Sequence, residues 1–204
     1  MIKKQIKDIA EIRSGYQFRG KVEASDDPNV AVIQIKDLGD RLNVRPGEMI
    51  TIQLDDLVRV RLENPEPHFV RSGDVLFLSR GQRQIAVVIS EPVTATIATG
   101  YFFVLRPDTN KVRPGFLAWF INQAEFQEML RPLSRGTHMP LVSKSDFQDL
   151  LITLPPLAVQ EKILELQNLF DRERELTSAL QHKRGELVQA ISRLLLTGQL
   201  KTKE

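Results

Sequence analysis

A long C-terminal segment without proline constrains the fold of this chain more than any other feature. Pro155 and Pro156 mark its beginning, because two consecutive prolines stop the preceding element and can open a helix. From Val159 to about Leu196 there is no further proline, and Gly198 provides a C-terminal stop. Apolar residues fit a heptad frame over roughly five heptads. The segment therefore predicts one helix on the order of 55 Å long that forms a coiled coil.

The apolar heptad positions predict a surface for a partner helix. They are Ile163, Leu166, Phe170, Leu180, Leu187, Ile191 and Leu194. Polar residues interrupt the frame at Glu173, Thr177 and Arg184. A helix of this length exceeds what a domain of about 150 residues needs to cover its own core. We therefore expect residues 155–204 to form a dimerisation and docking segment, while folding of the helix back onto its own domain stays open as the alternative.

The region before the two prolines, residues 1–154, has the pattern of a mixed α/β domain. It holds most of the proline, glycine and aromatic residues. Short runs rich in branched and aromatic residues, bounded by turn residues, predict strands. These strands are Val30–Lys36, Val75–Leu78, Ile85–Ile89 and Phe102–Leu105. One helix is predicted from Pro114 to Leu130, where Leu117, Phe120, Ile121 and Ala124 recur at helical spacing.

Composition places the chain among globular proteins of a reducing compartment. Of its 204 residues, 42% are hydrophobic and 26% are charged. There is no cysteine, which excludes disulfides, thiolate zinc sites and cysteine nucleophiles. No apolar run is long enough for a signal peptide or a membrane span. We expect a cytoplasmic protein with no membrane partner.

No motif indicates a catalytic centre or a metal site. The three histidines lie far apart, and the chain has no nucleophile elbow and no Walker loop. The tetrapeptide Asn64–Pro67 partly resembles the catalytic motif of DNA amino-methyltransferases, but Pro67 stands where the base-stacking aromatic would be, so we interpret it as a turn. Asp27 with Gln34–Lys36 is a loose match to a Mg²⁺-dependent nuclease pattern in which Gln34 replaces an acid. A nuclease is therefore a disfavoured alternative.

Five segments, in order along the chain, resemble the specificity (S) subunits of type I restriction-modification systems. They are residues 12–18 (IRSGYQF), 32–38 (VIQIKDL), 72–81 (SGDVLFLSRG), 134–141 (SRGTHMPL) and 154–163 (LPPLAVQEKI). The resemblance covers nearly the whole chain, and the last two segments are its most specific part. One departure is Ala158-Val159, where family members often carry an acid before the glutamine. The larger departure is length, because typical S subunits have two recognition domains and two helices, so this chain resembles a half-length form.

The resemblance implies a division of labour among several proteins. The recognition domain would read double-stranded DNA in the major groove, and the helix would dock methyltransferase subunits. Adenine N6 methylation with S-adenosylmethionine would take place in those partners, so this chain would bind no cofactor and catalyse nothing. A restriction subunit is a further partner that the resemblance allows. We hypothesise a homodimer with antiparallel helices that reads a bipartite site; a truncated decoy, which binds methyltransferase without DNA specificity, stays open as an alternative.

Two polar loops carry the residue types that base reading needs. The forked donors of arginine match guanine, and the amide of glutamine matches adenine. The first loop contributes Arg80, Gln82, Arg83 and Gln84, and the second contributes Arg135, Thr137 and His138. Weaker candidates, some of them for phosphate contacts, are Tyr16, Gln17, Arg19 and Lys36.

Overall fold

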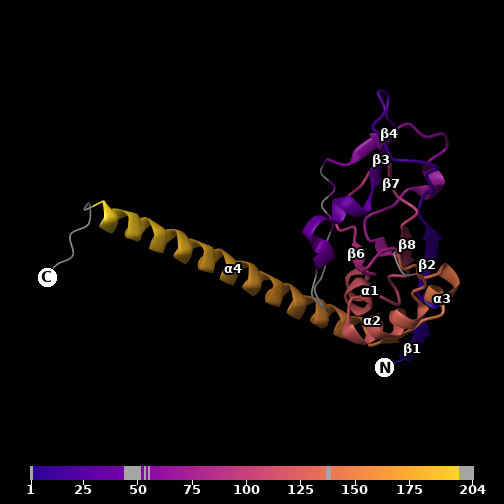
Figure 1. Ribbon diagram of the computed structural model, residues 1–204. Helices are drawn as coiled ribbons and strands as arrows, with labels where there is room; N and C mark the ends of the chain where they lie inside the picture. Colours follow the sequence, from indigo (N-terminus) through magenta and orange to yellow (C-terminus); the bar gives the residue numbers. More distant parts are fainter. Residues whose placement is uncertain (1, 44–51, 53, 55, 137–138, 198–204) are drawn as a thin grey trace. The chain divides into compact units, whose positions relative to one another are not determined.

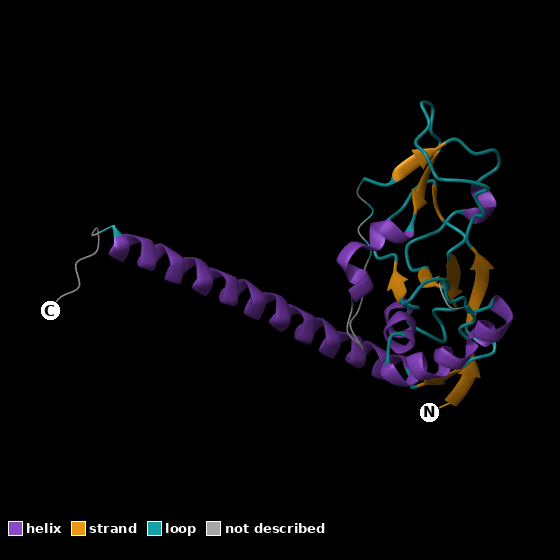
Figure 2. Ribbon diagram, viewed as in Figure 1, coloured by secondary structure: helices purple, strands orange, loops and turns teal. Residues whose placement is uncertain are grey.

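The computed structural model describes residues 2–43, 52, 54, 56–136 and 139–197, and it divides into two compact units, Met1–Leu164 and Glu165–Glu204 (Figure 1). The first unit is a mixed α/β domain, and the second consists of most of one long helix (Figure 2). The predicted fold class, an α/β recognition domain followed by a long C-terminal helix, is confirmed.

A four-stranded antiparallel sheet forms the centre of the domain. Its strands, in spatial order, are β2 (Ala10–Ser14), β8 (Phe102–Pro107), β5 (Val75–Leu78) and β6 (Ala86–Val88). All four residues of β5 are buried, because both faces of the sheet are covered. Alternate residues of β5 enter different clusters: Val75 and Phe77 join one core, whereas Leu76 and Leu78 join the other.

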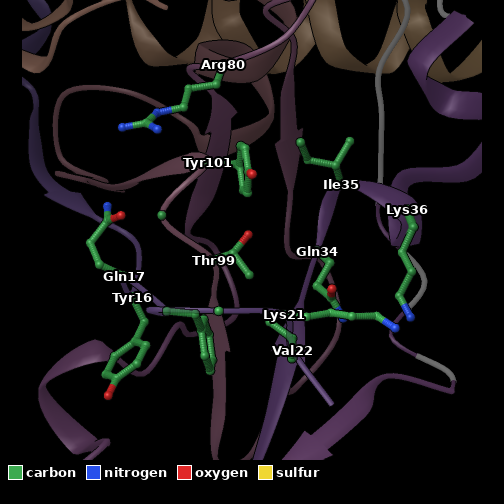
Figure 3. Close-up of a pocket in the computed structure, with 13 residues that line it drawn as sticks. Tyr16, Gln17, Lys21, Val22, Gln34, Ile35, Lys36, Arg80, Thr99 and Tyr101 are labelled. Carbon is green, nitrogen blue, oxygen red and sulfur yellow. The ribbon is translucent and has the colours of Figure 1, made fainter. Parts of the chain in front are cut away.

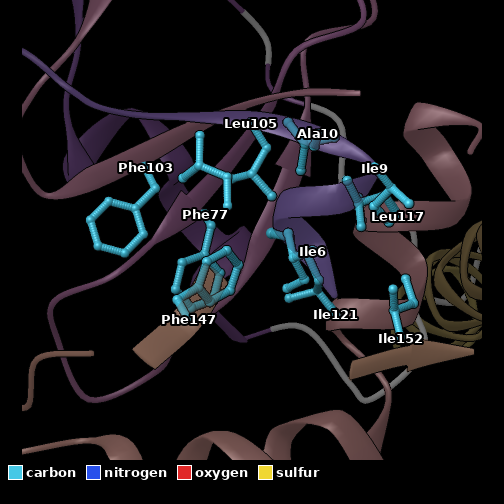
Figure 4. Packing of buried hydrophobic residues seen from close by; sticks show 14 of the residues in the cluster. Ile6, Ile9, Ala10, Phe77, Phe103, Leu105, Leu117, Ile121, Phe147 and Ile152 are labelled. Atoms are coloured by element: carbon cyan, nitrogen blue, oxygen red, sulfur yellow. The ribbon is translucent and has the colours of Figure 1, made fainter. Parts of the chain in front are cut away.

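Helices cover the face of the sheet that carries Phe77. These are α1 (Pro114–Ile121), α2 (Ala124–Leu130) and α3 (Lys144–Gln148). Phe147 of α3 stacks on Phe77 with ring centroids 4.1 Å apart, and Ile6, Ile121 and Ile152 complete this core (Figure 4). Among the described residues, 3₁₀ segments connect the elements: η1 (Ile6–Asp8), η2 (Ile35–Asn43), which is kinked at Gly39, η3 (Glu66–His68) and η4 (Arg131–Leu133).

Two smaller sheets complete the domain. The strands β4 (Val58–Val60), β3 (Val30–Ile33) and β7 (Thr96–Ala98) form one of them, in which β3 and β7 are parallel. The strands β1 (Ile2–Gln5) and β9 (Leu151–Leu154) form the other. Their antiparallel pairing joins the beginning of the domain to the segment that leads into the long helix.

The strand prediction at Val75–Leu78 is confirmed, but two other predicted elements need correction. The strand predicted over Val30–Lys36 ends at Ile33, because the chain turns into η2 and the Gln34 backbone N–H donates to Asp37 Oδ2 at 2.7 Å. The helix predicted from Pro114 to Leu130 is two helices. It breaks at Asn122, whose buried amide accepts from the Ala86 N–H and donates to the Ala86 carbonyl, each at 2.8 Å.

Asp74 explains the Gly-Asp pair that precedes β5. Its buried carboxylate accepts from the Arg71 backbone N–H at 2.9 Å and from Arg106 Nε and Nη2 at 2.9 and 2.8 Å. These hydrogen bonds with Asp74 raise the pKa of Arg106 above its ordinary value, so the guanidinium stays protonated. Gly73 has a φ of 87°, a left-handed conformation that glycine adopts at no steric cost. The pair thus closes a turn and places a bidentate ion pair between the start of β5 and the end of β8.

The long helix α4 (Leu157–Leu196) begins inside the domain. Gln160 is fully buried there; its Oε1 accepts from the Arg113 N–H at 2.8 Å, and its Nε2 donates to the carbonyls of Pro155 and Lys111 at 2.9 and 3.2 Å. Ile163 is half-buried and packs against the first core. Its assignment to the partner-facing stripe is therefore wrong, because this first apolar position of the frame serves its own domain.

We expect Gln160→Leu to lower the free energy of unfolding of the domain by about 2–3 kcal/mol, because the backbone groups of Arg113, Lys111 and Pro155 lose three partly buried hydrogen bonds to the Gln160 side chain. Urea denaturation followed by tryptophan fluorescence measures this loss. The control is Glu161→Gln, which removes only the half-exposed ion pair between Glu161 and Arg113 and costs about 0–1 kcal/mol. Equal losses for the two variants would contradict the anchoring role of Gln160.

Candidate functional site

A pocket of about 450 Å³ lies in the domain where four segments that are distant in sequence meet (Figure 3). Residues from 16–22, 34–36 and 99–101 line it together with Arg80. Four of the residues proposed from sequence are therefore neighbours around one cavity: Tyr16, Gln17, Lys36 and Arg80. Nothing in the sequence pattern alone indicated that the entry segment and the end of β5 lie this close.

The turn after β7 is the hub that holds these segments together. The Tyr16 N–H donates to the Ala98 carbonyl at 2.8 Å, and the Thr99 N–H donates to the Ile33 carbonyl at 3.0 Å. Both the backbone N–H and the hydroxyl of Ser79 donate to the Tyr101 carbonyl, each at 2.9 Å. Each segment that lines the pocket is thus tied to residues 98–101, so the pocket is formed by backbone contacts rather than by loosely held side chains.

Two glycines allow this close approach. A Cβ on Gly15 would lie 2.7 Å from the Ala98 carbonyl oxygen and nearer still to that of Thr99. A Cβ on Gly100 would overlap the side chain of Gln17, which lies across it. Gly15 therefore fixes the approach of two backbones, whereas Gly100 only makes room for a side chain.

The pocket wall is cationic and rich in hydrogen-bond donors. Its charged lining residues are Lys21, Lys36 and Arg80, and no described residue that lines it carries a carboxylate. Lys21 lies 3.8 Å from Glu23 in an exposed pair. Within the described part of the chain, three buried polar atoms of the wall have no hydrogen-bond partner: Gln34 Nε2, Arg80 Nε and Thr99 Oγ1. The wall therefore suits a ligand that offers acceptors and negative charge.

The second part of the site is the tip that joins β5 to β6. The Gly81 N–H donates to the Pro140 carbonyl at 3.0 Å. The backbones of Arg80 and Arg135 both form isolated antiparallel β-bridges with Leu141. The two polar loops predicted from sequence are therefore neighbours. At this tip Gln82 and Arg83 are exposed, and the side chain of Arg135 is 80% exposed with its Nη2 3.5 Å from Asp146 Oδ2.

Gln84 is the one predicted base-reading residue that the structure reassigns. It is only 8% exposed, and its Nε2 donates to Ser134 Oγ at 3.0 Å and to the Gly81 carbonyl at 3.2 Å. Its Nε2 joins the two loops, so the amide nitrogen of this buried side chain is engaged within the domain. Arg19 is exposed but does not line the pocket, and Thr137 and His138 lie outside the described residues.

Sequence reasoning missed Lys21, Gln34 and Thr99. The sequence places Gln34 in a segment of the family resemblance and in a defective metal-binding pattern, but not among the DNA-contacting residues. Thr99 follows a strand, β7, that the sequence pattern does not predict. A lysine just after the entry segment was the one available signal, since basic residues beside aromatic ones suit nucleic-acid surfaces.

The described residues give no support to the nuclease alternative. They contain no group of three or more histidine, aspartate or glutamate side chains that could hold a metal ion. Asp27, the acid on which that alternative rested, is paired with Arg61. Asn64 has a φ of 50° and leads into η3, which confirms the turn at Asn64–Pro67. None of the helices in the described ranges has the length and apolar character to cross a membrane.

Comparison with known families decides between the remaining interpretations of this site. The family model described as the type I restriction modification DNA specificity domain matches residues 1–183. This chain belongs to that family. The resemblance drawn from five short segments is therefore confirmed, and the match extends over the whole recognition domain and into α4.

Solved structures show the fold of this specificity domain in longer proteins. The HsdS subunit from Thermoanaerobacter tengcongensis matches with a TM-score of 0.64 and 17% identity over 98% of this chain and 45% of that chain. The S subunit from M. genitalium matches with a TM-score of 0.57 and 14% identity over 96% of this chain and 46% of that chain. A third structure comes from work on the complex assembly and conformational transition of the type I R-M system. It matches with a TM-score of 0.61 and 19% identity over 95% of this chain and 43% of that chain. This chain thus spans less than half the length of each of them.

Proposed function

We propose that this chain is a non-catalytic specificity subunit that recognises duplex DNA through the pocket and the adjoining tip. The observation that carries the proposal is their continuity: Arg80 lines the carboxylate-free pocket and also begins the tip that presents Gln82 and Arg83. A cationic cavity beside exposed arginine and glutamine matches the two kinds of contact that sequence-specific proteins make, to phosphates and to base edges. Membership of a DNA specificity domain family supports the same interpretation.

Base reading falls to the exposed tip. Side chains must enter the major groove to reach base edges, and a tight connection between two buried strands can present them on a stiff support. Arg83 and Arg135 offer the forked donors that match guanine, and Gln82 offers the donor and acceptor pair that matches adenine. Each well-placed bidentate contact contributes about 1–3 kcal/mol of discrimination.

The chemistry that follows recognition is assigned to partners. A specificity subunit would direct DNA methyltransferase subunits to the site, and adenine N6 methylation with S-adenosylmethionine would occur there. One similar structure concerns the complex assembly of the type I R-M system. This similarity supports methyltransferase subunits as partners and allows a restriction subunit as well. A protein that acts on DNA together with these partners would work in the cytoplasm.

The second unit supports a homodimer through α4. Eleven large apolar residues in the described part of the chain after Leu164 are exposed. All of them except Leu196 share one face of α4: Leu166, Leu169, Phe170, Leu176, Leu180, Leu187, Val188, Ile191, Leu194 and Leu195. At 100° per residue they fall on one stripe roughly 120° wide, which is wider than a strict heptad seam. A second copy with an antiparallel helix would cover this stripe and place two recognition domains on two half-sites. The wide stripe also leaves apolar surface for methyltransferase helices.

Selection from a random duplex library tests the DNA-reading role. We expect the full chain to enrich one motif, and Gln82→Ala or Arg83→Ala to relax one base of that motif by about tenfold. Arg61→Ala is the matched control, because Arg61 pairs with Asp27 and does not line the pocket, so its motif should be unchanged. Absence of enrichment by the wild-type chain, alone and with a methyltransferase, would contradict the proposal and favour a decoy.

A further inference from the structure

The pocket and the tip differ in shape, and this difference separates their roles. Base edges lie at the floor of the major groove, about 8.5 Å deep, so only side chains that project from the protein reach them. Phosphates project from the duplex instead. A recessed cavity can therefore receive the backbone of the duplex but not the edge of a paired base.

The chemistry of the pocket wall fits a phosphate. Gln34 Nε2, Arg80 Nε and Thr99 Oγ1 are all able to donate, and all three lack a partner in the described structure. Thr99 is only 5% exposed, so its hydroxyl is held in the wall without a compensating hydrogen bond. Each of the three atoms has less than 1 Å² of accessible surface, so it reaches an acceptor in the cavity only when its side chain rotates toward it. Leaving such a donor unpaired costs free energy, and an incoming acceptor that meets the rotated side chain recovers it. Phosphate oxygens are strong acceptors, and the nearby lysines supply the opposite charge.

Building on the proposed DNA-binding function, we propose that this pocket is a phosphodiester-binding site that fixes the register of the recognition domain on the DNA backbone. Lys36 and Arg80 neutralise the phosphate, and the Thr99 hydroxyl and the Gln34 amide donate to its oxygens. Base discrimination then resides in Gln82, Arg83 and Arg135 at the tip, which the anchored phosphate holds over the groove. The pocket contributes affinity on every sequence and no preference between bases.

The backbone contacts of the wall support an anchoring role. Thr99 is tied to β3 and Ser79 to Tyr101 by the hydrogen bonds that close the hub. The end of β5 leads through Arg80 directly into the tip, so one residue of the pocket wall is continuous in backbone with the tip. A phosphate held by the first would therefore set the position of the second.

The salt dependence of DNA binding tests this site. Fluorescence anisotropy of the full chain, on the selected duplex and on a random duplex, would be measured over a range of salt concentrations for wild type and Lys36→Met. We expect Lys36→Met to weaken binding to both duplexes by about tenfold and to reduce the slope of log K against log salt by about 0.9. Gln82→Ala is the control: it should weaken binding to the selected duplex alone and leave the slope unchanged.

A second arm identifies the phosphate. Neutral methylphosphonates would be placed singly along the selected duplex, or along the random one if no motif is enriched. A methylphosphonate at one position should weaken DNA binding by the wild-type chain by about tenfold. The same methylphosphonate should have little further effect on DNA binding by Lys36→Met or by Thr99→Val. Thr99→Val keeps the shape and charge of the side chain but lacks the hydroxyl. The DNA-backbone site is overturned if no methylphosphonate position couples to these variants. It is also overturned if the variants change the binding of free inorganic phosphate but not the binding of the duplex backbone. A changed base preference in Lys36→Met would also overturn it. If the wild-type chain shows no sequence preference but one methylphosphonate position still couples to the variants, only the proposed specificity is contradicted.

Discussion

Replacing Gly15 by alanine is expected to lower the free energy of unfolding of the recognition domain by about 3–5 kcal/mol. The new Cβ would lie within 2.7 Å of the Ala98 carbonyl oxygen, and that contact involves backbone that cannot turn away. Relief requires residues 15–16 to move off the hub, which costs the Tyr16 N–H bond to Ala98 and the Gly15 N–H bond to Phe102. Overpacking of this kind costs about 1–3 kcal/mol, and each lost hydrogen bond adds about 1 kcal/mol.

Two other glycines provide matched controls for this loss. A methyl group added at Gly20 would have no atom within 4 Å, so Gly20→Ala should leave stability unchanged or slightly raised. The three atoms nearest to a new Cβ at Gly100 all belong to the side chain of Gln17, which can turn away, so Gly100→Ala should cost little stability while displacing Gln17 from the pocket wall. Urea denaturation of the three variants measures the differences. If Gly15→Ala were as stable as Gly20→Ala, the close approach at the hub would be wrong.

Placing glutamate at both Leu187 and Ile191 is expected to raise the dissociation constant of the proposed homodimer by more than a hundredfold. Both side chains lie on the apolar stripe of α4 and are 59% and 42% exposed in the single chain. Burying each contributes about 1.5–3 kcal/mol, and each substitution occurs twice in a symmetric dimer. Buried carboxylates without partners add a further cost. Sedimentation velocity over a concentration series measures this change.

The control for the helix lies on its opposite face. Gln189→Glu adds one carboxylate between the two altered positions but points away from the stripe, so it should leave the dimer intact. Far-UV circular dichroism checks that the helix persists in each variant. A wild-type chain that sediments as a monomer, both alone and with methyltransferase, would contradict the dimer, and so would a charged stripe that leaves the dimer unchanged.

Features that depend on local sequence were predictable. The buried run Val75–Leu78 between turn residues gave a strand with the correct bounds, and the proline pair preceded a helix that begins at Leu157. The family was also predictable, because short motifs carry it in order. Gln160 gives a structural reason for the segment 154–163: its side chain hydrogen-bonds the Arg113 N–H and the Pro155 carbonyl in the first turn of α4.

Features that depend on distant partners were not predictable from local pattern. Gln82 and Gln84 are equivalent in the sequence of the tip, yet Gln84 is buried by its hydrogen bond to Ser134, which is 50 residues away. Asn122 interrupts an apolar helical pattern because it pairs with the edge of β6. Ile163 fits the heptad frame as well as Leu166 does, and only the packing of the domain separates them. The pocket has the same origin, since its wall comes from four segments joined by the hub.

Methylome sequencing of cells with and without this chain tests most directly whether it reads DNA for a methyltransferase. We expect one methylated adenine motif with two symmetric halves to disappear when the chain is removed and to return with the wild-type gene. Complementation with Arg83→Ala should return methylation with a relaxed base in each half, whereas complementation with Arg61→Ala should return the original motif. An unchanged methylome in the absence of the chain would contradict its role as a specificity subunit.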